Sequence, residues 1–208
     1  MKRTNSSARW LNEHFNDYYV KQAQKEGYRS RAAFKLLELN ERDHLLKPGM
    51  TVVDLGAAPG GWSMVAQQKV GGKGRVVALD ILAMALLPGV DFLQGDFNEE
   101  TVVTELIKRV DNHPVDLVMS DMSPNITGIA AIDQARAFQL NEQALEFSQI
   151  VLKVGGNFLV KVFQGQGFDA FLKAVRANFT QVNIRKPKSS KARSQEIYIV
   201  GIAKKNSI

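Results

Sequence analysis

The feature that most constrains the fold is a regular alternation, after residue 50, of short apolar runs with segments of helical periodicity. Each run is long enough for a buried strand, and in the segments between them apolar residues recur every three or four positions. The runs cover 51–55, 75–79, 90–93, 115–120 and 156–163, and the helical segments cover 61–69, 99–110, 133–152 and 168–178. This order predicts an α/β fold with a doubly wound, mostly parallel sheet and helices on both faces.

The end of the chain breaks this alternation. Two further apolar runs, 181–184 and 196–203, have only a basic loop rich in serine and lysine between them. Because strands joined without a helix pair antiparallel, we expect these two to form an antiparallel C-terminal pair. The complete sheet would then have seven strands.

Before residue 50 the sequence is helical in pattern. An amphipathic helix is expected from residue 6 onward, and a second opens at Ser30 and ends before Pro48. At 208 residues the chain has room for one domain and a short appendage. We therefore divide it into a basic N-terminal helical extension, 1–48, packed on the same domain, and a catalytic domain, 49–208.

The net charge of +6 is carried by the two ends of the chain. Residues 1–35 hold eight Lys/Arg against three acids, residues 181–208 hold seven against one, and the middle is acidic. Basic ends favour a nucleic-acid substrate, although solvated termini have the same composition. The chain has no cysteine, and its longest apolar stretch, 76–90, is cut by Asp80. We expect a cytoplasmic monomer without a membrane segment.

The turn after the first predicted strand has the composition of a cofactor loop. Gly56, Gly60 and Gly61 lack side chains where a cofactor would approach the backbone. A tight turn or a dinucleotide site would also explain these glycines. Pro59, however, removes a backbone donor that a pyrophosphate would need. The loop therefore favours S-adenosylmethionine, which carries no phosphate, over NAD.

Acidic residues follow the next strands, at the edge where an open sheet binds its ligand. Asp80, 26 residues after Asp54, is placed to accept both ribose hydroxyls of an adenosine. Asp96 follows the third strand and can accept from the adenine amino group, with a solvated turn aspartate as the alternative. Asp121 ends the fourth strand, where methyl acceptors meet the cofactor. Its segment, Ser-Asp-Met-Ser-Pro-Asn, lacks the proline-proline-aromatic order of amino-group methyltransferases.

Lys161 is the least expected residue, because it interrupts a predicted central strand where lysine is rare unless paired. A lysine snorkelling from a strand end is the alternative. Asp121, Glu196 and Lys35 can all reach the same edge. Two lysines and two acids would suit deprotonation of a ribose hydroxyl, a reaction that needs no metal when the methyl group is already activated. Burial and a second cation favour the neutral amine and Asp121 the charged one, so both protonation states stay open.

Together these motifs resemble the FtsJ/RrmJ family of ribosomal RNA 2′-O-ribose methyltransferases. The resemblance spans nearly the whole chain, on segments 7–11, 29–36, 54–62, 91–97, 120–125, 161–165 and 193–196. It implies the Rossmann-like fold of class I S-adenosylmethionine-dependent methyltransferases. It also implies a catalytic tetrad of Lys35, Asp121, Lys161 and Glu196, and cofactor contacts from Gly60, Trp62, Asp80, Asp96 and Asp121, beside Gly56 in the same loop.

The resemblance further implies a substrate, the 2′-hydroxyl of one uridine in the A loop of 23S rRNA within the large (50S) ribosomal subunit. Another RNA such as transfer RNA, or a non-enzymatic RNA-binding role, is the alternative. The basic ends would form a phosphate-contacting rim from Arg9, Lys21, Lys25, Arg29, Arg31 and the loop 185–193. One segment departs from the family pattern: after Asp80 a proline and an acid are replaced within Ile-Leu-Ala-Met-Ala, which affects the contacts expected around the adenosine.

Overall fold

The computed structural model describes residues 17–111, 113–191 and 194–206. Most of the helix expected from residue 6, and with it Arg9, lies outside these residues, as does Arg193 in the C-terminal loop. The helices are α2 (Tyr18–Glu26), α3 (Ala32–Asp43), α4 (Gly61–Val70), α5 (Glu100–Val110), α6 (Ala130–Val151) and α7 (Phe168–Asn178). The strands are β1 (Thr51–Leu55), β2 (Arg75–Asp80), β3 (Val90–Gln94), β4 (Val115–Ser120), β5 (Leu152–Phe163), β6 (Phe179–Arg185) and β7 (Glu196–Lys204).

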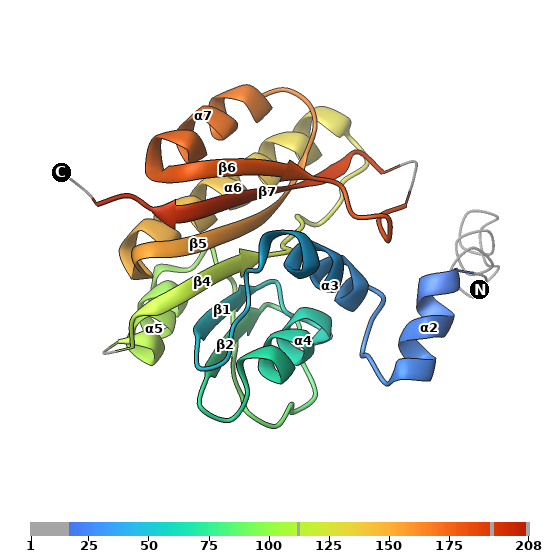
Figure 1. Ribbon diagram of the computed structural model, residues 1–208. Helices are drawn as coiled ribbons and strands as arrows, with labels where there is room; N and C mark the ends of the chain where they lie inside the picture. Colours follow the sequence, from blue (N-terminus) through green and yellow to red (C-terminus); the bar gives the residue numbers. More distant parts are fainter. Residues whose placement is uncertain (1–16, 112, 192–193, 207–208) are drawn as a thin grey trace.

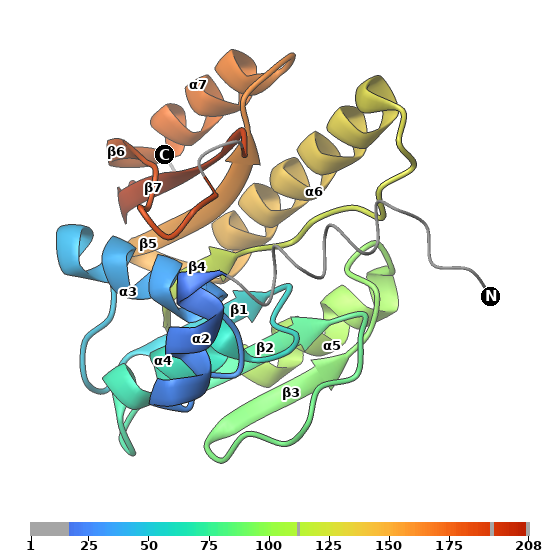
Figure 2. The ribbon, with the colours of Figure 1, turned by 90° about the vertical axis from the view of Figure 1, so that its right-hand side faces the viewer.

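The strands form one seven-stranded sheet in the order β3-β2-β1-β4-β5-β7-β6 (Figures 1 and 2). The first five strands of this order are parallel, and β7 runs antiparallel to both β5 and β6. The order reverses between β1 and β4, and in such a sheet a crevice opens beyond the carboxyl ends of these two strands. The α/β prediction, with its antiparallel C-terminal pair, is confirmed.

Helices cover both faces of the sheet, and each face has its own apolar core (Figures 1 and 2). Residues of α5, α6 and α7 pack on one face, and residues of α3 and α4 pack on the other. Alternate residues of a strand point to the same face. Leu159 belongs to the core under α3 and α4, so Lys161, two residues later, faces the same helices.

The predicted and observed boundaries differ most at β5. The strand begins at Leu152 rather than at residue 156, because α6 runs into it without a loop. A register shift against β4 falls between Val115 and Leu117, and Gly155, at φ +81°, lies in this irregular stretch. The regular pairing that positions the end of β5, with Lys161, starts at Asn157.

The N-terminal helices pack on the sheet domain to different extents. Helix α3 contributes Leu36 and Leu39 to the core under the sheet, whereas α2 rests on α3 through the rings of Tyr19 and Phe34, 5.5 Å apart. Asp17 caps α2 and also pairs with Arg31 at the start of α3. The division of the chain at residue 48 stays a prediction. None of the described helices has the length and apolar character needed to cross a membrane.

Candidate active site

A cavity of about 330 Å³ lies beyond the carboxyl ends of β1, β2, β3 and β4. Of the six residues predicted to bind the cofactor, Gly56, Asp80, Asp96 and Asp121 line it. The wall also includes Ile81 and Leu82 of the segment that departs from the family pattern, Met122 of the segment after β4, and two residues that the sequence did not single out, Asn98 and Leu140. The predicted edge of the sheet therefore holds a real cavity with three carboxylates in its wall.

Asp80 and Asp96 keep hydrogen-bonding capacity for a ligand. Each Asp80 oxygen accepts one backbone N–H, from Ala58 or from Leu82, at 2.8 Å. In Asp96, Oδ1 accepts both the backbone N–H and the side-chain amide of Asn98, at 2.9 and 2.7 Å. Because a carboxylate oxygen has two lone pairs, both oxygens of Asp80 can still accept, and so can Oδ2 of Asp96. These groups fit the diol and the exocyclic amine of an adenosine.

The glycines of the loop are required by packing of the protein on itself. Gly56 has φ +79°, and a β-carbon there would lie 2.8 Å from the backbone nitrogen of Met122. Gly60 has φ +104°, and a β-carbon there would lie 2.9 Å from Sδ of Met84. The loop can therefore lie against the segments that follow β4 and β2 only because these two residues lack side chains.

Two of the residues expected to contact the cofactor lie outside the cavity wall. Neither Gly60 nor Trp62 is among the lining residues of the cavity. The Trp62 side chain is buried in the core between α3 and the sheet, where its indole N–H donates to the carbonyl of Ala32 at 2.9 Å and its ring lies 5.8 Å from that of Tyr198. The start of α4 thus directs the Trp62 side chain toward α3 and away from the cavity wall.

The segment after Asp80 that departs from the family pattern is held by hydrogen bonds from the N-terminal part of the chain. The guanidinium of Arg29 donates to the carbonyls of Ala85 and Leu86, both at 2.6 Å. At the other end of the segment, Ile81 lines the cavity while its side chain is more than half exposed. Arg29 thus holds a partly apolar wall of the cavity in place without the proline and acid expected there.

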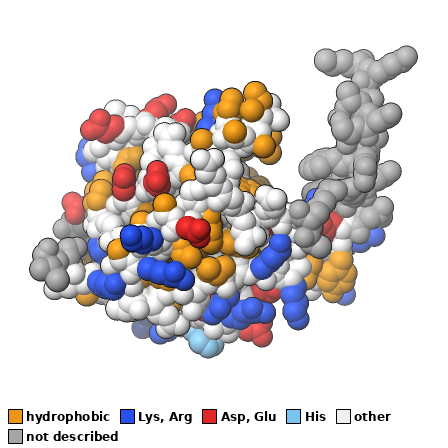
Figure 3. Space-filling model, turned by 90° about the horizontal axis from the view of Figure 1, so that it is seen from above, with side chains coloured by type: hydrophobic (Ala, Val, Ile, Leu, Met, Phe, Trp, Pro, Cys, Tyr) orange, Lys and Arg blue, Asp and Glu red, His pale blue; other side chains and the backbone are white. Residues whose placement is uncertain are grey.

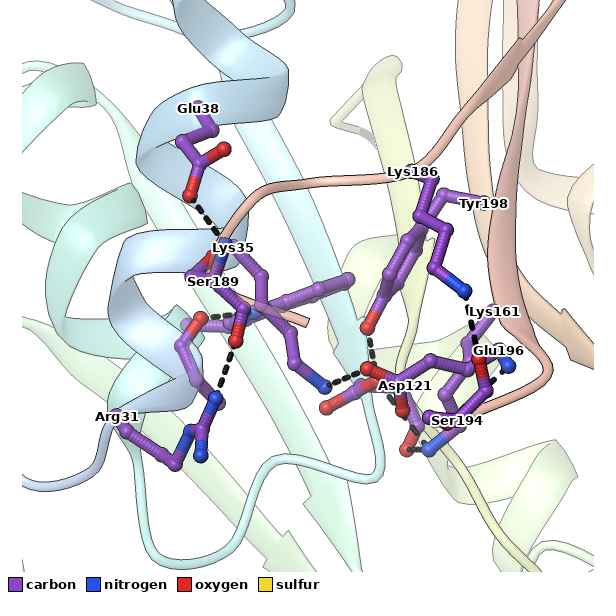
Figure 4. A network of polar contacts seen from close by, with 12 residues as sticks. Arg31, Lys35, Glu38, Asp121, Lys161, Lys186, Ser189, Ser194, Glu196 and Tyr198 are labelled. Carbon is purple, nitrogen blue, oxygen red and sulfur yellow. Dashed lines mark hydrogen bonds and ion pairs between the residues drawn. The ribbon is translucent and has the colours of Figure 1, made fainter. Parts of the chain in front are cut away.

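The four predicted catalytic residues come together as two linked pairs (Figure 4). Lys161, with only 8% of its side chain exposed, donates through Nζ to the carbonyl oxygen of Asp121 at 2.6 Å and lies 3.2 Å from its Oδ1. Lys35, from α3, pairs with Glu196, at the start of β7, at 2.7 Å. Residues from four elements distant in sequence therefore converge on one point above the sheet.

Tyr198 links the two pairs and was not predicted. It lies opposite Lys161 in the β5–β7 register, and its hydroxyl donates to Oδ1 of Asp121 at 3.1 Å. Nζ of Lys35 lies 5.8 Å from the centre of its ring. Burial, and then the charges of Asp121 and Glu196, raise the pKa of Tyr198 well above its usual value. The sequence signal was available, because Tyr198 is two residues after Glu196 in a strand and so shares its face.

The charge of Glu196 is set by its neighbours. Burial raises the pKa of this carboxyl, but the charge and hydrogen bond of Lys35, with a smaller effect from Lys161, outweigh burial and hold the pKa below its ordinary value. Glu196 is therefore an anion at neutral pH, and it neutralises Lys35 rather than Lys161.

Asp54 plays a different part from the other acids of the sheet edge. It is fully buried, does not line the cavity, and accepts a hydrogen bond from the hydroxyl of Ser63 at 2.6 Å. Burial raises its pKa to about 7, even though Ser63 lowers it. Among the described residues, no group of three or more His, Cys, Asp or Glu side chains could hold a metal ion.

Known proteins resemble this chain over most or all of its length. The profile of the FtsJ-like methyltransferase family matches residues 28–204. A ribosomal RNA large subunit methyltransferase E of Nitrosospira multiformis is 63% identical over 99% of this chain and 100% of its own length. The protein of the same name from Methylobacillus flagellatus is 58% identical over the whole of both chains.

Solved structures share the fold. A putative ribosomal RNA methyltransferase from Plasmodium falciparum superposes with a TM-score of 0.78 at 27% identity, covering 86% of this chain and 100% of its own. A putative rRNA-methylase from Clostridium thermocellum, at 21% identity and a TM-score of 0.53 over 83% of this chain and 95% of its own, shares the fold alone. By its sequence and its fold, this chain belongs to the FtsJ-like methyltransferase family.

Proposed function

We propose that this chain transfers a methyl group from S-adenosylmethionine to the 2′-hydroxyl of a uridine in the A loop of 23S rRNA, within the large ribosomal subunit. The family supplies the reaction class, and the names of the relatives supply ribosomal RNA of the large subunit. The observation that carries the ribose hydroxyl as acceptor is the buried amine of Lys161, held against Asp121 beside the cavity.

The described residues of the cavity fit the methyl donor. Asp80 would hold the ribose diol of the cofactor and Asp96 its adenine amino group. Gly56 lies in the same wall and puts no side chain in the way of the cofactor. When bound, S-adenosylmethionine supplies a methyl group already activated by a sulfonium. The protein therefore has mainly to position the acceptor and to receive its proton.

Lys161 is the proposed proton acceptor. A ribose hydroxyl is a weak acid, and its oxygen loses a proton as it gains the methyl carbon. Asp121 orients the Lys161 amine through its carbonyl and Oδ1 atoms, so that the remaining position on Nζ can address the substrate hydroxyl. In its neutral form this amine has a lone pair for the proton, which would be released to solvent after transfer.

Lys35 and Glu196 are proposed to position the acceptor ribose. Their ion pair is neutral as a whole. Tyr198 connects this pair to Lys161, because Nζ of Lys35 lies near its ring and Lys161 is its partner on the neighbouring strand. A charged pair of this kind can donate from Lys35 and accept at Glu196, which matches the hydroxyl and ring oxygens of a sugar.

Labelling of candidate RNAs tests the proposal. The protein is incubated with labelled S-adenosylmethionine and either large subunits lacking the methyl group or bulk transfer RNA. We expect label in 23S rRNA of the subunits and none in transfer RNA. The reverse labelling would contradict the substrate assignment, and label in neither RNA, despite cofactor binding, would favour a non-enzymatic RNA-binding role.

A further inference from the structure

A second cavity, of about 200 Å³, adjoins the tetrad. It is lined by Arg31, Ala32, Lys35, Lys191, Ser194 and Glu196. The cofactor cavity is lined by Asp121 from one pair of the tetrad, and this second cavity is lined by Lys35 and Glu196 from the other pair. The tetrad thus lies between two cavities, and so far only the first has been assigned a ligand.

The second cavity is electropositive. Its wall has three cations and one acid, and that acid, Glu196, is already neutralised by Lys35. Arg31 is paired with Asp17. Lys191 has no acidic partner among the residues that the structure describes, so its charge is available to a ligand. Ala32 begins α3, which has no side-chain cap, and the positive end of the helix adds to the same potential.

The loop that carries Lys191 is fixed to α3. The carboxylate of Glu38 accepts the backbone N–H groups of Lys188 and Ser189, at 2.6 and 2.9 Å, and Arg31 donates to the carbonyl of Ser189 (Figure 4). On the far side of Lys191, the amine of Lys186 donates to the carbonyl of Ser194 at 2.6 Å. Because Lys188, Ser189 and Ser194 are held by these contacts, the entropic cost of ordering the loop around Lys191 on binding is lowered.

We propose that this second cavity binds the phosphate attached to the ribose that is methylated, with Lys191 as its principal contact. The inference rests on the proposed function, because only an RNA acceptor brings a phosphodiester to the tetrad. In RNA the 3′-phosphate is attached at the carbon next to the one that bears the 2′-hydroxyl. When that hydroxyl meets Lys161, the phosphate must lie a few bonds away, and the cavity lined by Lys35 and Glu196 is there to receive an anion.

The test compares Lys191→Met with Lys173→Met, which makes the same change on α7, outside the proposed phosphate-contacting rim. Lys173 is exposed and does not line the cavity. Large subunits lacking the methyl group are the substrate. We expect Lys191→Met to lower kcat at saturating subunit about tenfold, because a phosphate next to the reacting ribose fixes its orientation. Lys173→Met should change kcat less than about twofold, and Lys191→Arg should restore most of the activity.

Binding provides a readout that does not depend on turnover. The affinity for subunits is measured without cofactor at several salt concentrations. Lys191→Met should reduce the slope of log K against log salt by about one, while cofactor affinity stays unchanged. Equal kcat and equal salt slopes for Lys191→Met and wild type would overturn the phosphate site. A wild-type protein that leaves subunits unlabelled would contradict the proposed function itself and remove the site with it.

Discussion

At the scale of single residues, the proposed chemistry depends on how Lys161 is buried. Among the described residues, Nζ has two polar partner atoms, both from Asp121, and it lies 5.9 Å from the centre of the Phe163 ring. These contacts hold the lysine in one orientation, because Asp121 binds its amine through two atoms and only 8% of its side chain is exposed. Its removal should therefore affect the reaction far more than it affects the cofactor cavity, which Lys161 does not line.

Replacement of Lys161 by methionine tests this role. We expect Lys161→Met to lower the single-turnover rate of methyl transfer at least about a hundredfold, the usual contribution of a positioned base. Its affinity for S-adenosylmethionine, measured by calorimetric titration, should stay within about twofold of wild type. Lys153→Met is a matched control, because Lys153 lies on the same strand, half-exposed and paired with Asp116 at 2.5 Å. Parallel losses of rate and cofactor affinity in Lys161→Met would instead assign the lysine a structural role.

The raised pKa of Asp54 predicts a dependence of folding stability on pH. Its pKa is raised from 3.8 to about 7 in the folded protein, so between these values the folded state holds a proton that the unfolded state has lost. The contribution of Asp54 to the free energy of unfolding therefore falls as pH rises through this range, by about 1.4 kcal/mol per pH unit.

Substitution by asparagine isolates this effect. Asp54→Asn keeps an acceptor for the Ser63 hydroxyl but cannot ionise. Urea denaturation at pH values from about 4 to about 8 should show the variant gaining stability relative to wild type as pH rises, with no further change above about pH 8. A difference in stability that is constant across this range would show that Asp54 is ionised in the folded protein.

At the scale of elements, the loop between β6 and β7 is positioned by α3. Glu38 accepts two backbone N–H groups of the loop, and Asp43, five residues further along the helix, binds the side chains of Arg185 and Asn183. Helix α3 also supplies Lys35 to the tetrad. One helix therefore fixes both a tetrad residue and the loop that borders the second cavity.

Glu38→Ala should release this loop. We expect faster amide hydrogen exchange at Lys188 and Ser189 and a KM for subunits raised several-fold, with cofactor affinity unchanged, because the basic loop must then be ordered on binding. Glu41→Ala is the control, since Glu41 is an exposed acid on the same helix without a contact to the loop. Unchanged exchange at both amides would show that the loop is held by other contacts.

The elements were largely predictable, because each depends on a local pattern. The strands were recognised from short apolar runs, and the parallel order placed Asp80, Asp96 and Asp121 at one edge as expected. The side-chain directions were less predictable. Trp62 turns into the core under α3, and Glu38 binds a loop 150 residues away. Such contacts depend on how distant elements pack. The periodicity of a single segment gives no information about that packing.

At the scale of the whole molecule, the described parts of the two basic ends of the chain lie side by side. Arg185, just before the C-terminal loop, pairs with Asp43 of α3, and Arg31 reaches the loop itself. In Figure 3, Lys and Arg side chains gather in the lower half of the face seen from above. Basic segments far apart in the sequence thus meet at α3, the helix that carries Lys35, and form one basic surface there.

This surface predicts a strong dependence of subunit binding on salt. If it contacts several phosphates, the logarithm of the affinity should fall linearly with the logarithm of salt concentration, with a slope steeper than about −3. The affinity for S-adenosylmethionine, measured in the same buffers, should change little. Filter binding at a series of potassium chloride concentrations measures the slope, and a slope near zero would exclude phosphate contacts as the source of affinity.

The central claim is that the acceptor is a ribose hydroxyl presented to Lys161. The most direct test is to treat subunits lacking the modification with the protein and S-adenosylmethionine, digest the 23S rRNA and identify the methylated nucleoside by mass spectrometry. We predict 2′-O-methyluridine from the A loop with wild type and with Lys153→Met, and none with Lys161→Met. A methyl group on a base, or full modification by Lys161→Met, would contradict the account.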